Sequence, residues 1–114
     1  MKTQTTQIKC NNHIISEHTL IPETIWEKFM GLRNKHIEIN DAMLFKVKSP
    51  LPELFDSFFC EPIRYIATDI KGNVLKTGIM KSNKIMIVKC AYWLELHPER
   101  IYEVNTGDII TGLN

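Results

Sequence analysis

The sequence predicts a mainly β fold, namely a small antiparallel β-sandwich or partly open barrel with one or two short helices. About seven short apolar stretches are bounded by Gly, Pro and Asn, which is typical of strands separated by turns. The sequence lacks the regular alternation of strands and helices that builds a parallel sheet. The chain has 114 residues, of which 44% are hydrophobic. We therefore expect residues 1–114 to form a single domain around one core.

The N-terminal part of the chain predicts a β-hairpin. Residues 7–10 and 13–15 are the two strands, and Asn11 and Asn12 between them tolerate the left-handed conformation that a tight turn needs. Residues 16–21 are expected to continue in an extended conformation.

A helix is predicted over residues 22–31. Pro22 suits the first helical turn, and Gly31 is a natural stop. Apolar residues at helical spacing form one face: Ile25, Trp26, Phe29 and Met30. We expect this face to pack into the core rather than to bind a partner helix.

Four strands are predicted in the middle of the chain, over residues 42–47, 62–69, 74–81 and 85–88. Pro50 and Pro52 interrupt the pattern, so residues 49–57 are expected to form a loop or one helical turn. The second and third strands should pair antiparallel about a Lys71-Gly72-Asn73 turn, with Gly78 marking a bulge or a close approach.

A further strand is predicted over residues 92–96. Tyr92, Leu94 and Leu96 alternate with Trp93, Glu95 and His97, so the first set should face the core. We expect Trp93 to be half-buried beneath a loop or helix. After it, the sequence predicts a short helix opened by Pro98 and supplied with apolar contacts up to Val104, a turn at residues 105–108 and a strand at 109–111.

Four further motifs occur in a recognisable order. Trp26–Arg33 is a charged helix running into Gly-Leu, Asp41–Phe45 ends in Met-Leu-Phe, Thr68–Val74 contains Asp-x-x-Gly, and Ala91–Leu96 is followed by a Gly-Asp turn in Val104–Ile110. Together they resemble the domain of unknown function 192 family over roughly residues 18–112. The resemblance implies a small β-rich sandwich with a helix near its N-terminus. That family has no established biochemical activity, so the resemblance supplies a fold rather than a function.

One segment departs from the family pattern. Where the family usually carries Trp-Met-x-Asn-Thr shortly before Pro-Leu-Asp, this chain has Phe58-Phe59-Cys60-Glu61 and then Pro62-Ile63-Arg64. The Asn and Thr are absent, and a base replaces the acid. If Phe58 to Arg64 corresponds to a functional surface of the family, its function is altered or lost in this protein.

The net charge, the apolar runs and the cysteines argue against several classes of function. The formal net charge of +1 gives no overall attraction to nucleic acid or to an anionic membrane. No apolar run is long enough for a transmembrane helix or a secretory signal, so we predict a cytoplasmic protein with no membrane partner. Cys10, Cys60 and Cys90 are an odd, widely spaced set, which predicts reduced thiols, the last two packed as small hydrophobes. Their spacing fits no common metal site, and no metal or cofactor is predicted.

The charge is unevenly distributed along the chain. Six bases and one acid between Arg64 and Lys89 give a local charge of +5, and one base and four acids after Lys89 give −3. The basic strip is a candidate for weak nucleic-acid binding. Only one aromatic residue, Tyr65, accompanies it, and lysines on edge strands also keep sheets soluble. Nucleic acid is therefore an unfavoured but open partner.

The leading functional hypothesis is a non-enzymatic binding or interaction module for an unknown small ligand or protein. Its surface would involve Arg64, Trp93, Glu95 and His97, because a Trp among polar neighbours can anchor a binding surface. The alternative is a small hydrolase or lyase that uses Glu95 with His97 or Asp108 for acid–base chemistry. The sequence lacks the common phosphate-loop, nucleophile-elbow and zinc-protease motifs, which favours binding over catalysis.

Overall fold

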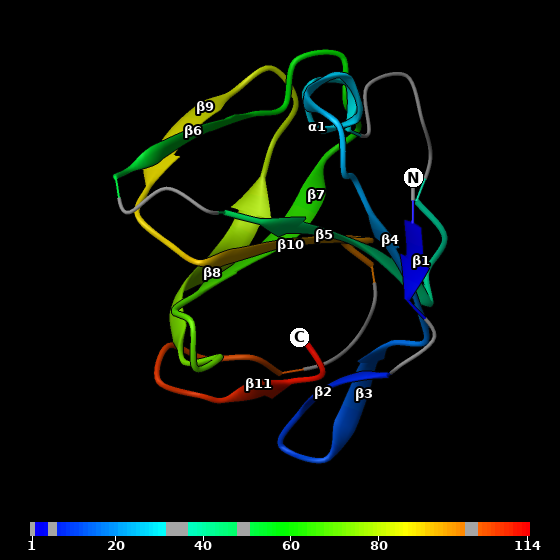
Figure 1. Cartoon of the computed structure of the whole chain (residues 1–114), viewed down its shortest axis with the longest axis vertical. Helices are drawn as coiled ribbons and strands as arrows, with labels where there is room; N and C mark the ends of the chain where they lie inside the picture. The colour runs from blue at the N-terminus through cyan, green and yellow to red at the C-terminus, as the bar shows by residue number, and fades with distance from the viewer. Residues whose placement is uncertain (1, 5–6, 32–36, 48–50, 100–102) are drawn as a thin grey trace.

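A curved six-stranded sheet forms the middle of the molecule, and a smaller sheet lies on each side of it (Figure 1). The computed structural model describes residues 2–4, 7–31, 37–47, 51–99 and 103–114. Neighbouring strands of the central sheet are antiparallel except for the parallel pair β4–β5. Their order is β1 (Lys2–Gln4), β4 (His18–Ile21), β5 (Asp41–Lys46), β10 (Tyr92–Leu96), β7 (Ile63–Thr68) and β8 (Val74–Met80). The predicted mainly β, largely antiparallel fold is confirmed.

A three-stranded sheet covers one face of the central sheet. It consists of β11 (Ile110–Thr111), β2 (Ile8–Cys10) and β3 (His13–Ser16), with the antiparallel pairs β11–β2 and β2–β3. Asn11 and Asn12 adopt φ values of 51° and 67°, as the predicted hairpin turn requires. A first core cluster lies between these sheets and includes Ile8, Ile15 and Leu94.

A two-stranded sheet lies on the other side of the central sheet. It pairs β6 (Glu53–Asp56) antiparallel with β9 (Ile85–Val88). The expected loop or helical turn over residues 49–57 is therefore wrong, because Pro52 stands just before the strand rather than inside it and removes no ladder hydrogen bond. A second core cluster, with Met43, Tyr65, Trp93 and Cys90, lies on this face.

The turn after β6 is fixed by the buried Ser57. Its hydroxyl donates to the Lys81 carbonyl at 2.6 Å and accepts from the Lys84 backbone N–H at 2.9 Å. The Ser57 backbone N–H donates to the Lys84 carbonyl at 2.9 Å. These bonds hold the end of β6 to the β8–β9 connection.

The helix α1 spans Ile25–Met30. It begins after the N-cap Thr24 in a capping box with Glu27, three residues beyond the expected start at Pro22, and Gly31 ends it as predicted. Trp26 and Phe29 of its apolar face do not enter the core, since they are 68% and 58% exposed and stack on each other. The helix instead approaches the sheet with its C-terminal end, because a Cβ at Gly31 would lie 3.5 Å from Phe45 Cζ.

The remaining described elements match the sequence-based prediction, with one additional strand. The bulge in the β7–β8 pair lies at Ala67/Thr68, while Gly78 makes the expected close approach, because a Cβ there would lie 3.3 Å from the Tyr65 hydroxyl. The strand β1 was not predicted. Of the segment predicted as a second helix, Pro98 and Glu99 form a turn and residues 103–104 are irregular, while residues 100–102 lie outside the described residues.

Among the residues that the structure describes, α1 is the one helix, and no helix has the length and hydrophobicity that crossing a membrane requires.

Candidate functional site

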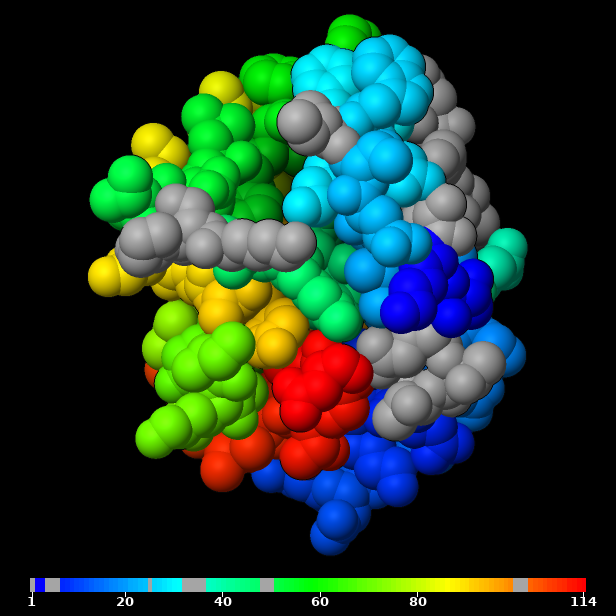
Figure 2. Space-filling model, viewed as in Figure 1, coloured from blue at the N-terminus to red at the C-terminus, as the bar shows by residue number. Residues whose placement is uncertain are grey.

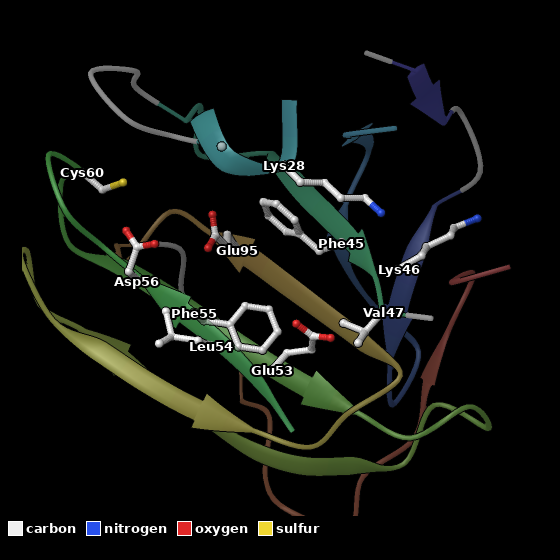
Figure 3. A pocket seen from close by; sticks show the side chains of 11 residues that line it. Lys28, Phe45, Lys46, Val47, Glu53, Leu54, Phe55, Asp56, Cys60 and Glu95 are labelled. Atoms are coloured by element: carbon white, nitrogen blue, oxygen red, sulfur yellow. The ribbon is translucent and has the colours of Figure 1, made fainter. Parts of the chain in front are cut away.

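A pocket of about 230 Å³ lies between α1, the central sheet and β6. Lys28 and Gly31 line it from the helix end, Glu95 from β10, and Cys60 from the turn after β6 (Figure 3). The remaining lining residues come from the end of β5 and from β6: Phe45, Lys46, Val47, Glu53, Leu54, Phe55 and Asp56. Figure 2 shows a hollow between α1, in cyan, and the green segment that contains β6. The pocket is open on one side, so a small molecule can reach it.

Glu95 contributes a buried carboxylate to this pocket. Its side chain stands on the central sheet and the residue is only 7% exposed. Its Oε2 accepts a hydrogen bond from Trp93 Nε1 at 3.0 Å. The Trp93 indole N–H is one of the groups that hold this carboxylate in place. The pocket therefore contains a strong acceptor whose orientation is set by a neighbouring side chain.

Three nearly parallel aromatic rings support the pocket from behind. Trp93 is fully buried, and the Phe55 ring from β6 stacks on it at 3.9 Å between centroids and 6° between planes. Tyr65 stacks on the indole at 4.9 Å and 4°. Burial raises the pKa of the Tyr65 phenol above its ordinary value of 10.0, so the hydroxyl stays protonated at neutral pH. Trp93 is thus covered by a strand and its aromatic ring, not half-buried beneath a loop or helix as expected.

The charged groups around the pocket are unevenly placed. Figure 3 shows the ammonium ends of Lys28 and Lys46 toward one side of the view and Asp56, Cys60 and Glu95 toward the other. Lys28 is exposed, Lys46, Glu53 and Asp56 are half-buried, and Glu95 is buried. Among the described residues that line the pocket, Glu95 is therefore the most buried charged side chain.

The structure brings together only part of the predicted site. Trp93 and Glu95 lie side by side on one face of β10. Arg64 alternates with Ile63 and Tyr65 of the second core cluster, so its side chain leaves β7 on the opposite face of the sheet. Arg64 consequently does not share a surface with Trp93 and Glu95.

His97 and Asp108, the two proposed acid–base partners of Glu95, lie in different parts of the fold. His97 is half-buried just beyond β10, and its Nδ1 accepts the Glu99 backbone N–H at 3.0 Å. Asp108 accepts the Asn105 backbone N–H at 2.8 Å and lies 3.8 Å from the Cys10 thiol, which belongs to the first core cluster. Asp108 is therefore on the other side of the central sheet from Glu95, and the structure does not bring these two carboxylates together.

The basic strip from Arg64 to Lys89 is spread along the β7–β8 hairpin and β9. Its lysines are exposed, but Lys71 lies at one end of the hairpin and Lys81 and Lys84 at the other. Tyr65, the aromatic residue that the nucleic-acid hypothesis used, is buried against Trp93. This arrangement offers no aromatic platform beside the lysines within the described hairpin.

The sequence reading missed most of the pocket wall. Phe45 was expected only as a strand residue, Phe55 fell in the expected loop, and Lys28 was assigned to the polar face of the helix. One feature of the sequence pointed to the pocket. Cys60, which lines it, belongs to the segment from Phe58 to Arg64 that differs from the pattern of the domain of unknown function 192 family. The three cysteines are free thiols, with Cys90 buried in the second core cluster and Cys60 packed against it, as predicted.

Comparison with known proteins supports the fold. No family model matches the chain, and no curated protein matches it. A solved structure of a protein of unknown function from Novosphingobium aromaticivorans DSM 12444 is similar with a TM-score of 0.76 and 13% identity, over 93% of this chain and 84% of that one. A protein from Sinorhizobium meliloti 1021, described as a "putative transcription regulator", is similar with a TM-score of 0.77 and 16% identity, over 97% of this chain and 94% of that one. At these identities the similarity concerns the fold alone.

Proposed function

We propose that this protein is a non-enzymatic binding module that holds a small organic molecule in the pocket between α1, β5, β6 and β10. The observation that carries the proposal is the buried carboxylate of Glu95 in a pocket that Phe45 and Phe55 also line. A concave site in which aromatic walls are combined with fixed polar groups is a usual form of a small-molecule site. The pocket volume of about 230 Å³ suits a ligand of the size of one substituted ring, since a cavity of about 150 Å³ is enough for benzene.

The placement of the side chains favours binding over a Glu95–Asp108 pairing and over nucleic-acid binding. A hydrolase or lyase that pairs Glu95 with Asp108 lacks support because the two residues lie on opposite sides of the central sheet. Nucleic-acid binding lacks support from the dispersed lysines and the buried Tyr65. Membership of the domain of unknown function 192 family and a cytoplasmic location remain predictions, the latter supported by three free thiols.

The proposal is tested with three ring-sized probes: benzylamine, benzyl alcohol and benzoate. Each is titrated into the ¹⁵N-labelled protein while amide and indole resonances are recorded. We expect at least one probe to shift the resonances of the pocket residues and of the Trp93 indole in a saturable manner. Failure of all three probes to bind there would refute a ring-sized ligand site.

A variant with a filled pocket makes the test specific. Val47→Phe adds a ring at a half-buried lining position, whereas Leu75→Phe adds the same ring at an exposed position on β8. We expect Val47→Phe to weaken probe binding by about tenfold or more, which is a loss of about 1.4 kcal/mol. Leu75→Phe should leave binding unchanged. Equal effects of the two substitutions would place the probes elsewhere on the surface.

A further inference from the structure

We infer that the pocket binds a short peptide in an extended conformation, which pairs with the open edge of β6 and places one apolar side chain beside Phe45 and Phe55. The inference rests on the proposed function, because it names the chemical class of the ligand for the same site. It follows from the backbone groups that border the pocket and does not depend on the balance of charged side chains.

The strand β6 meets the pocket with its edge. Its four consecutive residues, 53–56, all line the pocket, whereas no residue of β9 does, although the structure describes the whole of β9. Side chains alternate between the two faces of a strand, so one face supplies every second residue. A run of four lining residues therefore indicates an edge. Within the described part of the chain β6 pairs with β9 alone, so the edge at the pocket is the open one.

Leu54 directs its backbone N–H and C=O to this open edge. The Ser57 N–H donates to the Lys84 carbonyl at 2.9 Å, and the Ser57 carbonyl accepts from the Asn83 N–H at 3.0 Å. Both backbone groups of Ser57 thus face the side of β9. The direction of these groups alternates from residue to residue in an antiparallel pair, so Phe55 faces β9 and Leu54 faces away from it. Among the described residues, none bonds to the Leu54 backbone groups.

A donor and an acceptor on one strand residue favour a ligand that presents both groups at the same spacing. A residue of an extended peptide does so, because its N–H and C=O point the same way and pair with those of a neighbouring strand. An alcohol satisfies one of the two groups at a time, an ammonium group only donates, and a carboxylate only accepts. The peptide backbone is therefore the ligand chemistry that satisfies Leu54 completely.

The register of this pairing sends one ligand side chain into the pocket. The ligand residue opposite Leu54 shares the outer, exposed face of β6, whereas the residue before it lies opposite Phe55 and shares the inner face. On that face the Phe55 ring stacks on Trp93, and Figure 3 shows the Phe45 and Phe55 rings around the same space. The pocket of about 230 Å³ accommodates one ring there.

The first experiment compares the blocked dipeptide N-acetyl-Phe-Ala-N-methylamide with its ester analogue, in which lactate replaces alanine. The ester lacks the N–H that would donate to the Leu54 carbonyl. The Trp26→Phe protein is used, because Trp93 is then its only tryptophan and reports on the pocket through its stack with Phe55. By indole fluorescence and NMR titration, we expect the peptide to bind about fivefold or more tightly than the ester and than benzyl alcohol. Equal affinities for peptide and ester would overturn the inference.

A pair of proline substitutions tests the protein side of the contact. Leu54→Pro removes the N–H at the open edge, where no bond to β9 is lost. Ile87→Pro is the matched control, because Ile87 lies directly opposite Leu54 and directs its N–H to the outer edge of β9, away from the pocket. We expect the preference for the peptide over benzyl alcohol to fall about fivefold or more in Leu54→Pro and to persist in Ile87→Pro. An equal fall in both variants would contradict pairing at β6.

Hydrogen exchange locates the contact in the parent protein, so it decides the question even if Leu54→Pro does not fold. The amides of Leu54 and Ile87 should both exchange rapidly in the free protein, because neither is bonded within the two-stranded sheet. At saturation with the peptide, we expect slower exchange at Leu54 and unchanged exchange at Ile87. Unchanged exchange at Leu54 would refute the proposed pairing.

The length of the open edge limits the length of the ligand. Since β6 has four residues, a blocked hexapeptide with alanines on both sides of Phe-Ala should bind within about threefold of the dipeptide. A much higher affinity for the hexapeptide would mean that a segment of a longer chain, and not a short peptide, is the ligand.

These outcomes are distinguishable from failure of the proposed function. If neither the ring probes nor the peptide binds in the pocket, the binding function itself fails. If benzyl alcohol binds there and the peptide binds no more tightly than its ester, the binding function stands and the peptide class is wrong.

Discussion

Trp93 and Glu95 form a buried hydrogen-bonded pair on one face of β10, with the indole Nε1 donating to Oε2 at 3.0 Å. The fully buried indole is itself held in a stack with Phe55 and Tyr65. Each member of the pair therefore fixes the other: the carboxylate satisfies the buried N–H, and the immobilised indole sets the direction of the carboxylate at the pocket. A binding group that is held by a packed neighbour loses little freedom when a ligand arrives.

Glu95→Ala is expected to lower the free energy of unfolding by about 1–3 kcal/mol, because the buried indole N–H loses its acceptor. Glu95→Gln keeps an acceptor oxygen and should change stability by less than about 1 kcal/mol. Urea denaturation followed by circular dichroism measures both. If the two variants were equally stable, the hydrogen bond to Trp93 would not account for the burial of Glu95.

Phe55→Ala is expected to expose Trp93 to water. The substitution removes the ring that stacks on the indole at 3.9 Å, and for this half-buried phenylalanine we expect a stability loss of about 2 kcal/mol. In the Trp26→Phe background, the emission of Trp93 should shift to longer wavelength and become accessible to acrylamide. Leu54→Ala is the matched control, because Leu54 is the adjacent, exposed residue of β6. A similar red shift in Leu54→Ala would contradict the role assigned to the Phe55 ring.

Much of the central sheet could be predicted from local pattern. The alternation of residues 92–96 and the two asparagines of the first turn dictate a strand and a hairpin through short-range geometry alone. The strand β6 could not be predicted in this way. Pro52 directly before the strand interrupts the apolar pattern from which a strand would be predicted. The strand is stabilised by pairing with β9 and by the packing of Phe55 on Trp93, which are long-range contacts.

The pocket was even less predictable from local pattern than β6, because it is built from residues that are distant in the sequence. The sequence placed Trp93 and Glu95 on one face of a strand, which is correct, because alternation decides it. It also grouped Arg64 with them, although Arg64 leaves β7 on the opposite face. The apolar pattern of the helix correctly indicated amphipathicity, but pattern does not reveal what covers an apolar face. Here Trp26 and Phe29 remain exposed, because the short helix meets the sheet with its end.

The capping box of Thr24 is expected to control the helix wall of the pocket. Thr24 Oγ1 accepts the Glu27 backbone N–H at 3.0 Å, and the helix has only six residues. So short a helix is unstable by itself, and Thr24→Ala should cost about 1 kcal/mol of local stability. Hydrogen exchange of the α1 amides should accelerate in Thr24→Ala, with little change in the exchange of β10. Thr24→Ser retains the acceptor and should behave as the parent protein. Faster exchange in both variants would show that the side-chain cap is not what stabilises α1.

Cys90 is expected to make the folded state less stable in alkali. Burial, and secondarily the negative charge of Glu53, raises the pKa of its thiol from 9.0 to about 11. Between these two pH values the unfolded chain loses the thiol proton while the folded protein keeps it, so the free energy of unfolding falls as pH rises. Complete passage through this window corresponds to a loss of up to about 2.7 kcal/mol from this group. Below about pH 8 the thiol is protonated in both states and contributes no pH dependence.

Cys90→Ala should therefore reduce the alkaline loss of stability, even though it also lowers stability at every pH by removing a buried side chain. The measurement is the difference in unfolding free energy between the parent protein and Cys90→Ala, taken from urea titrations at several values from pH 8 to about 11. We expect that difference to shrink steadily above pH 9. Leu75→Ala, at an exposed position that carries no titrating group, should show a constant difference. A constant difference for Cys90→Ala as well would mean that the thiol titrates alike in the folded and unfolded chains.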